Sequence, residues 1–436
     1  MFKTVTVILI MLSIFISSYV FFKIPFEAYF GYAVFVLYFP VFFAKYGIPR
    51  APVLLFLPLF LTGVLFVFIG LNTSQQFYKV FIGFFASVLF YHYVVELFAF
   101  NIKELFRIYM KASYYVSILG LIQLMSYLVG FKFGYDYSWL LNKWGFIPGG
   151  LGIRVNSIFG EPAYFAATIS PAFFVAVYNF TVAEPLFVTR KQSIVIGLAY
   201  LLTYSSLGIL GIFLTTLFLL INLGFFRYAI LFVPLSIFIF DYSYENVAEF
   251  RERYDGTFEI FSTANYKSYD INGSSFVLYN NYHVALENFK RNPLFGTGLG
   301  SHPVAFDKYS LTNLEGAVNI DFNKMDANSM FLRLMSETGI YGLFVMIFFI
   351  FKCWVWRQRT TDNSMWVMSN GIAVMILLYM IRQGHYFLNG FPFFLWMFYY
   401  VYVENVKLRA ASAEAQQSEI EQNAISSSPN APAHIE

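Results

Sequence analysis

Residues 154–165 interrupt an apolar chain with groups that could act on a phosphate ester. The stretch reads Arg154-Val-Asn-Ser-Ile-Phe-Gly-Glu161-Pro162-Ala-Tyr-Phe. A planar guanidinium binds a phosphate through two parallel hydrogen bonds, so Arg154 is a candidate for gripping one; the alternative is that it only extends to lipid headgroups. Pro162 suits the first turn of a helix, so Glu161 is either a capping carboxylate or an acid–base group.

A second stretch, residues 282–302, combines basic side chains with a glycine-rich turn. A short helix is expected to end before Pro293, and the pattern N-P-L-F-G-x-G-x-G then predicts a flexible turn. The glycine run alone is weak support for a phosphate site, because no strand–helix unit surrounds it. Arg291 is a second candidate for a phosphate, whereas His283 and His302, taken singly, are typical of surface residues.

The third stretch opens an apolar helix that carries two charges. Asn328 or Asp326 is expected to cap this helix. An ionisable side chain at membrane depth is a functional candidate, which points to Glu337. Arg333 lies four residues before it, so the alternative is a simple ion pair.

The composition places these stretches in a membrane protein. Of 436 residues, 58% are hydrophobic and only 12% are charged, against about 25% charged in soluble domains. The mean hydropathy is +0.61. These values exclude a disordered chain, a coiled coil and an ordinary soluble enzyme. The net charge of +3 does not suggest nucleic acid as a partner, and the single Cys353 excludes an internal disulfide or a cysteine-based metal site.

Continuous apolar runs predict an all-α polytopic bundle of about twelve membrane-spanning helices. The run 193–223 is too long for one crossing, and polar residues 203–206 divide it into two short helices. The predicted segments lie at 4–22, 26–44, 51–70, 77–100, 108–130, 160–181, the two halves of 193–223, 228–241, 335–356, 365–383 and 387–405.

Basic residues in short loops predict the orientation. With twelve segments, both termini are cytoplasmic, and loops at about 131–159 and 242–334 face the periplasm, the second being large, ordered and partly helical. A cleaved signal peptide is the alternative for residues 1–22, but no small-x-small site precedes Lys23, so a retained first helix is expected. Residues 1–406 then form one transmembrane domain, and 407–436 are predicted to be a disordered cytoplasmic tail. The basic residues that fall on the cytoplasmic side are Lys3, Lys45, Arg50, Lys103, Arg107, Lys111, Arg190, Lys191, Arg227, Lys352, Arg357, Arg359, Lys407 and Arg409.

Together the three stretches resemble the O-antigen polymerase and O-antigen ligase superfamily of bacterial envelope polysaccharide enzymes. The shared patterns are R-x-x-S-x-F-x-E-P-x-x-F at 154–165, N-P-L-F-G-x-G-x-G at 292–300 and N-S-x-x-L-x-x-x-x-E-x-G-I-x-G-L at 328–343. Ligases of the superfamily commonly carry an arginine where this chain has Leu207 and a histidine where it has Ala327. The resemblance therefore favours the O-antigen polymerase branch.

The resemblance implies glycosyl transfer at the periplasmic face of the bacterial inner membrane. A growing glycan on undecaprenyl pyrophosphate would pass to a lipid-linked oligosaccharide repeat unit, giving O-antigen or a related surface polysaccharide. The expected partners are this lipid-linked substrate, membrane lipid and a chain-length regulator of the polysaccharide co-polymerase type. The alternatives are an O-antigen ligase that transfers the glycan to lipid A core, and a flippase or other transporter, although no pair of broken helices in repeated halves is visible.

A pyrophosphate leaving group accumulates negative charge, which proteins neutralise with a metal ion or with basic side chains. No acidic cluster in the outer loops predicts a metal site, so neither a metal, a cofactor nor ATP is expected. The candidate catalytic residues are Arg154, Glu161, Arg291 and His302. The candidate substrate-binding residues are Arg251, Arg253, His283, Asn328 and Glu337.

Overall fold

The computed structural model describes residues 2–23, 27–225, 248–263, 273–311 and 322–426, with a few scattered positions between 234 and 245. These residues form helices and no strands. The longer helices are α1 (Phe2–Phe15), α2 (Phe30–Tyr46), α3 (Arg50–Phe68), α4 (Ser74–Leu97), α5 (Ile102–Leu128), α7 (Pro162–Tyr178), α8 (Arg190–Leu201), α9 (Ser206–Asn222), α11 (Ala248–Thr263), α12 (Gly273–Arg291), α14 (Met330–Cys353), α15 (Asn363–Arg382) and α16 (Phe391–Ser426). The short ones are α6 (Lys132–Tyr135), α13 (His302–Tyr309), and the 3-10 turns η3 (Arg357–Arg359) and η4 (Leu388–Gly390).

Among the described residues, four helices are long and apolar enough to cross a membrane: α3, α4, α14 and α15. Shorter apolar helices lie at Thr4–Phe15, Phe30–Tyr46, Pro162–Tyr178 and Ser206–Asn222. The chain is therefore a helical protein of membrane character. Each predicted segment coincides with a helix except 228–241, which lies mostly outside the described residues. The first helix is shorter than predicted, because it ends at Phe15 and residues 16–23 are not helical.

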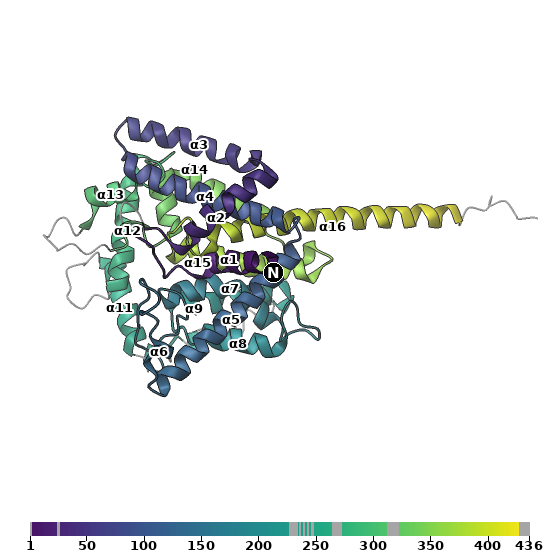
Figure 1. The fold of residues 1–436 in the computed structure, drawn as a ribbon, viewed down its shortest axis with the longest axis horizontal. Helices are drawn as coiled ribbons and strands as arrows, with labels where there is room; N and C mark the ends of the chain where they lie inside the picture. Colours follow the sequence, from purple (N-terminus) through teal and green to yellow (C-terminus); the bar gives the residue numbers. More distant parts are fainter. Residues whose placement is uncertain are drawn as a thin grey trace, which may run out of the picture.

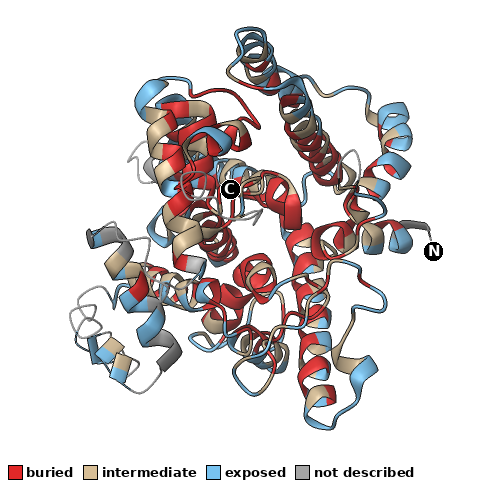
Figure 2. Cartoon of the chain, turned by 90° about the vertical axis from the view of Figure 1, so that its left-hand side faces the viewer, coloured by how far each residue is buried: buried red, intermediate tan, exposed pale blue. Residues whose placement is uncertain are grey.

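Buried residues line the inner helices of the bundle (Figure 2). Helix α15 belongs to this core, because its residues are buried along nearly its whole length. Helix α7 packs on it closely, since Gly371 lies against the backbone of Pro171 and the Trp366 ring meets Tyr178 at 5.1 Å. Helix α3 lies at the edge of the bundle (Figure 1) and exposes most of its apolar side chains, including Leu54 and Phe68. A face of this kind requires lipid or another protein to cover it.

Basic loops that were assigned to one side of the membrane meet at one end of the bundle. Lys103 forms an ion pair with Asp362 at 2.5 Å. Asn405 Nδ2 donates to the carbonyl of Arg359 at 3.1 Å, so the start of the C-terminal segment lies at the same end. Helices α11, α12 and α13 lie at the opposite end from the projecting part of α16 (Figure 1).

Residues 407–426, which were predicted to be disordered, form the end of a long helix. Helix α16 continues without a break to Ser426 and projects away from the bundle (Figure 1). Residues 407–426 are rich in alanine, glutamate and glutamine, which have high helix propensity, so the helix continues after its apolar contacts end. Residues 427–436 lie outside the described part.

The predicted division of 193–223 is confirmed. Helix α8 ends at Leu201, Tyr204 adopts a φ of 43°, and α9 begins at Ser206. The Ser205 side chain caps α9 by accepting a hydrogen bond from the Gly208 amide at 2.8 Å. A break between two helices leaves backbone groups without intrahelical partners. Polar side chains at this break satisfy some of these groups.

Helix α14 is kinked at Gly339, and the glycine-rich turn fills the kink. Gly339 has φ 63°, which frees the amides that follow it. The Ile340 amide donates to the Pro293 carbonyl at 2.8 Å, and the Tyr341 amide donates to the Leu294 carbonyl at 3.1 Å. In return, the Gly298 amide donates to the carbonyl of Glu337 at 2.7 Å. The glycine-rich pattern thus has a structural role, because it lets one backbone dock into another.

We expect Gly339→Ala to destabilise the protein. A Cβ at this position would lie 2.6 Å from the Pro293 carbonyl oxygen, and the left-handed backbone adds about 1–2 kcal/mol for a residue with a side chain. Thermal unfolding of the purified protein in detergent should show a clearly lower melting temperature. Gly197→Ala in α8 is the matched control, since a Cβ there meets nothing within 4 Å; it should be neutral or stabilising by about 0.5–1 kcal/mol. Equal melting temperatures for the two variants would contradict the described role of the kink.

Candidate functional site

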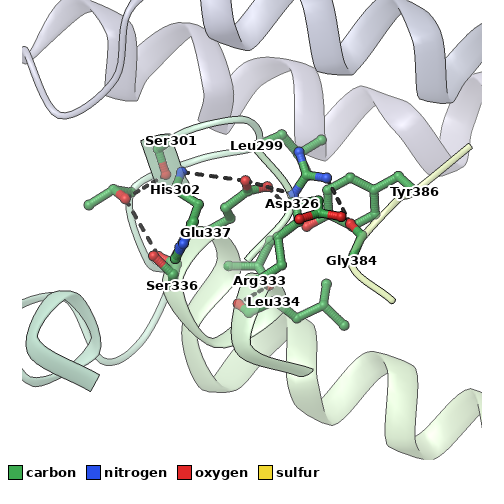
Figure 3. Close-up of polar contacts among 12 residues, drawn as sticks. Leu299, Ser301, His302, Asp326, Arg333, Leu334, Ser336, Glu337, Gly384 and Tyr386 are labelled. Carbon is green, nitrogen blue, oxygen red and sulfur yellow. Dashed lines mark hydrogen bonds and ion pairs between the residues drawn. The ribbon is translucent and has the colours of Figure 1, made fainter. Parts of the chain in front are cut away.

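A buried ion pair on α14 anchors the segment that follows α15 (Figure 3). Arg333 Nε lies 3.0 Å from Glu337 Oε1, and the two side chains are 4% and 0% exposed. Arg333 Nη1 also donates to the Gly384 carbonyl at 2.8 Å, and its guanidinium stacks 4.3 Å from the Tyr386 ring centroid. The Tyr386 hydroxyl donates to Glu337 Oε2 at 2.9 Å. The pair therefore fixes the chain on both sides of position 385.

The ion-pair interpretation of Arg333 and Glu337 is thus confirmed. Glu337, predicted to bind substrate, has no exposed surface, and its carboxylate oxygens are occupied by Arg333 and Tyr386. In this structure the Glu337 carboxylate holds Arg333 and Tyr386 in place.

His302, predicted to be catalytic, is also fully buried next to this pair (Figure 3). Its backbone amide donates to Glu337 Oε1 at 3.4 Å, and its Nε2 lies 3.0 Å from Asn281 Oδ1. Burial and the Arg333 guanidinium lower the pKa of His302 to about 3, with Asp326 opposing them. The imidazole is therefore neutral and enclosed, which corrects the expectation of a surface histidine.

A second ionisable pair joins two loops that are distant in sequence. His385 Nε2 lies 2.9 Å from Asp326 Oδ2, and the side chains are 22% and 8% exposed. Asp326 also accepts a hydrogen bond from the Asn328 amide at 3.1 Å. Burial alone would raise the pKa of Asp326, but His385, the Asn328 amide and Arg333 together lower it. This carboxylate is ionised at neutral pH.

Glu161 stands at the start of α7, the helix whose Tyr164 ring meets the His385 ring with centroids 6.1 Å apart. It occupies the N-cap position of α7 with Pro162 following, yet its side chain makes no capping hydrogen bond. Burial by the surrounding protein raises the pKa of Glu161, Asp326 raises it further, and His385 and Arg154 oppose the rise. The residue nevertheless keeps surface that solvent can reach. The carboxylate is thus within reach of a ligand and is not committed to the helix end.

Arg154 reaches the α8–α9 break. Its Nε donates to the Thr203 carbonyl at 3.3 Å, and the neighbouring Val155 amide donates to the Leu202 carbonyl at 3.0 Å. The guanidinium also acts electrostatically on Glu161. Arg154 and His385, a residue that was not predicted, therefore both act electrostatically on Glu161, and the His385 ring meets Tyr164 in the first turn of the same helix.

An ion pair ties the loop at 131–159 to the segment before α2. Lys143 Nζ lies 2.7 Å from Glu27 Oε2 and 3.0 Å from the Tyr29 hydroxyl. Burial would raise the pKa of Glu27, but the contacts with Lys143 and Tyr29 lower it below its usual value. This contact helps to hold the loop that carries Arg154 and Glu161.

Two other predicted basic residues, Arg291 and Arg251, make contacts of their own in the described part of the chain. Arg291 is exposed at the end of α12, with its guanidinium 4.9 Å from the Tyr309 ring centroid. Arg251, on α11, donates from Nε to the carbonyl of Tyr244, which precedes this helix, at 2.9 Å. The Arg253 side chain lies outside the described part, and His283 is half-buried on α12.

The start of α14 differs from its prediction. Ser329 caps the helix, with its side chain accepting from the Leu332 amide at 3.4 Å, in place of Asn328 or Asp326. Ala327 and Asn328 both have positive φ values, 57° and 55°, which turn the chain just before the helix. Asn328 is half-buried and accepts a hydrogen bond from Asn323. Because Ser329 caps the helix, the Asp326 carboxylate does not, and it pairs with His385.

His385 is the residue that sequence reasoning missed. It lies in the short turn between two predicted membrane segments, 365–383 and 387–405, on their predicted periplasmic side. A titratable side chain in so short a turn was the available signal. No family model matches the chain, and comparison with curated proteins finds no significant match. Within the described part, no group of three or more His, Cys, Asp or Glu side chains is placed to hold a metal ion.

We expect Glu337→Ala to cost much more stability than an exposed substitution. It would leave Arg333 buried without its carboxylate, a loss of about 3–5 kcal/mol. Glu287→Ala is the matched control, because Glu287 pairs with Lys290 on the exposed side of α12 and exposed pairs contribute little to stability. Thermal unfolding in detergent measures both variants. A Glu337→Ala protein as stable as the control would show that the pair does not anchor the site.

Proposed function

We propose that the chain is a membrane glycosyltransferase that polymerises undecaprenyl-pyrophosphate-linked oligosaccharide repeat units at the periplasmic face of the bacterial inner membrane. The observation that supports this best is the joining of Arg154, Glu161 and His385 at one end of an apolar helical bundle. A lipid-linked glycan has three matching parts: a hydrocarbon tail, an anionic pyrophosphate and sugar hydroxyls. Apolar helices, an arginine and acid–base groups are the complementary chemistry.

Arg154 is the group assigned to the pyrophosphate. Negative charge develops on the leaving group as the bond to the sugar breaks, and a preorganised guanidinium stabilises it. The α8–α9 break helps to position the arginine, since the Thr203 carbonyl accepts a hydrogen bond from Nε at 3.3 Å. An arginine can bind a backbone carbonyl and a phosphate at the same time, because its donors lie in one planar guanidinium.

Glu161 is assigned to the sugars. Its carboxylate is exposed, carries no capping bond and has a raised pKa. A carboxylate of this kind accepts hydrogen bonds from sugar hydroxyls without being fixed to its own helix. Glu161 follows Arg154 closely in the chain. One segment therefore carries the group assigned to the sugars and the group assigned to the pyrophosphate.

The orientation of the proposed enzyme follows from its charges. Twelve crossings with basic loops inside place both termini in the cytoplasm. Helices α11 to α13, at the end opposite to the projecting α16, then lie in the periplasm. This is the compartment in which lipid-linked repeat units would be joined, with a chain-length regulator of the polysaccharide co-polymerase type as the proposed partner.

The polymerase branch is favoured over the ligase branch by two buried apolar residues. Leu207 lies in the first turn of α9 and is 2% exposed, and Ala327 is 0% exposed. Ligases of the resembled superfamily carry an arginine and a histidine at the matching positions. In this chain both positions are packed inside the protein.

We expect Arg154→Ala to abolish long glycan while the protein remains in the membrane at a normal level. Arg154→Lys should restore only part of the activity, because an ammonium keeps the charge but loses the planar fork. Arg107→Ala is the control, since Arg107 is exposed and pairs with Glu104 at the other end of the bundle. The readout is the length distribution of surface polysaccharide on a gel. A full ladder from Arg154→Ala would reduce this residue to a surface anchor.

Deletion of the gene in its host tests the proposed function itself. A polymerase only joins repeats, so its loss should leave lipid A core bearing a single repeat unit, with the ladder absent. Loss of a ligase would leave bare core and polymer on the lipid carrier, and loss of a flippase would leave bare core and single units on the cytoplasmic side. Silver-stained lipopolysaccharide gels distinguish these patterns, and an unchanged ladder, in a host that makes no capsular polymer, would contradict the proposal.

A further inference from the structure

We propose that Asp326 and His385 form the acid–base pair of the site, with His385 taking the proton from the attacking hydroxyl of the acceptor sugar. The inference rests on the proposed glycosyl transfer and names the residue that activates its acceptor. None of the three sequence stretches contains His385, and its partner was expected only to cap a helix.

The contact itself has the geometry of an oriented base. Asp326 Oδ2 lies 2.9 Å from His385 Nε2, and the ionised carboxylate accepts a hydrogen bond from Nε2–H. This contact selects the tautomer in which Nδ1 carries the free lone pair. In the described part of the chain, no hydrogen bond occupies Nδ1. A carboxylate that orients a histidine toward a hydroxyl is the arrangement by which hydrolases activate a nucleophile.

The backbone around His385 is fixed at both neighbours. Arg333 holds the Gly384 carbonyl, and Glu337 holds the Tyr386 hydroxyl. Gly384 packs against the backbone carbonyl of Asp326 so closely that a Cβ would collide with it. The buried ion pair therefore fixes the backbone on both sides of His385, a residue that it does not touch directly.

On its other side, His385 faces the loop that carries the remaining site residues. Its ring meets Tyr164 edge to face, with centroids 6.1 Å apart. Glu161 lies close enough for His385 to act on its carboxylate electrostatically. Two carboxylates, Asp326 in contact and Glu161 across the site, stabilise the imidazolium that forms when the ring accepts a proton.

The step conserves atoms and charge. As the acceptor oxygen forms its bond to the anomeric carbon, its proton passes to His385 Nδ1. The bond from that carbon to the pyrophosphate oxygen breaks, and the lipid pyrophosphate leaves with the electron pair beside Arg154. The imidazolium then releases its proton to solvent, for which the side chain is 22% exposed. His302 has no exposed surface and does not serve this role.

The test uses the full-length protein in nanodiscs with purified lipid-pyrophosphate-linked repeat units. The wild type should form polymer, and His385→Ala should lose about 10²–10⁴-fold in kcat with little change in KM. Added imidazole should restore part of the rate of His385→Ala, which it would not do for a purely structural residue. Asp326→Asn should lower kcat without becoming sensitive to imidazole, because the base is present but misoriented.

His385→Gln guards against misfolding, because an amide can still donate to Asp326 but cannot take a proton. It should melt like the wild type and be as inactive as His385→Ala. His92→Gln is the histidine control, since His92 packs against Trp396 and Tyr400 near the other end of the bundle. Normal turnover by a stable His385→Gln, or failure of imidazole to rescue His385→Ala, would overturn the inference while leaving the polymerase intact. An inactive wild type would instead overturn the proposed function, and this inference with it.

Discussion

The buried ion pair between Arg333 and Glu337 is the interaction on which the candidate site depends. Taking two charges out of water is costly, and the attraction between them repays the cost only when further hydrogen bonds satisfy their remaining atoms. Here the Gly384 carbonyl, the Tyr386 hydroxyl and the His302 amide supply those bonds. Such a pair adds little net stability over an apolar equivalent. Its effect is to fix several chain segments in one arrangement, because any other arrangement leaves a buried charge without a partner.

The kink at Gly339 extends this constraint from side chains to backbone. A straight helix would have bonded its own amides and left no place for another segment. The kink instead exposes two amides to the carbonyls of Pro293 and Leu294, and the turn that supplies them leads directly into His302. The glycine-rich pattern and the pattern at the start of α14 are therefore two halves of one joint. Glycines are needed on both sides, since a Cβ at Gly296 would lie 2.5 Å from the backbone of Glu337.

This rigid joint contrasts with the group of side chains that it supports. Glu161, Arg154 and His385 retain exposed surface, whereas Glu337 and His302 have none. Burial thus separates the charged residues into those that build the site and those that a ligand can reach. Burial and the Arg333 guanidinium lower the pKa of His302 far below its usual value, whereas Asp326, which is almost as buried, stays ionised because His385, the Asn328 amide and Arg333 lower its pKa.

The sequence by itself determined the helical class, the membrane character, the break at 203–206 and the placing of Arg154 and Glu161 on one loop. These features follow from local properties: apolar length, polar interruption and the preference of proline for a first helical turn. Only the tertiary structure decided that Ser329 caps α14, that Glu337 and His302 are enclosed, and that Asp326 meets His385. Each of these depends on which distant segments pack together, and neither composition nor spacing records that choice. In the C-terminal segment the local sequence was misjudged instead. Its low hydrophobicity predicted disorder, but its helix propensity was sufficient to continue α16. A buried charge is recognised from sequence as unusual, but its partner is specified only by the fold that encloses it.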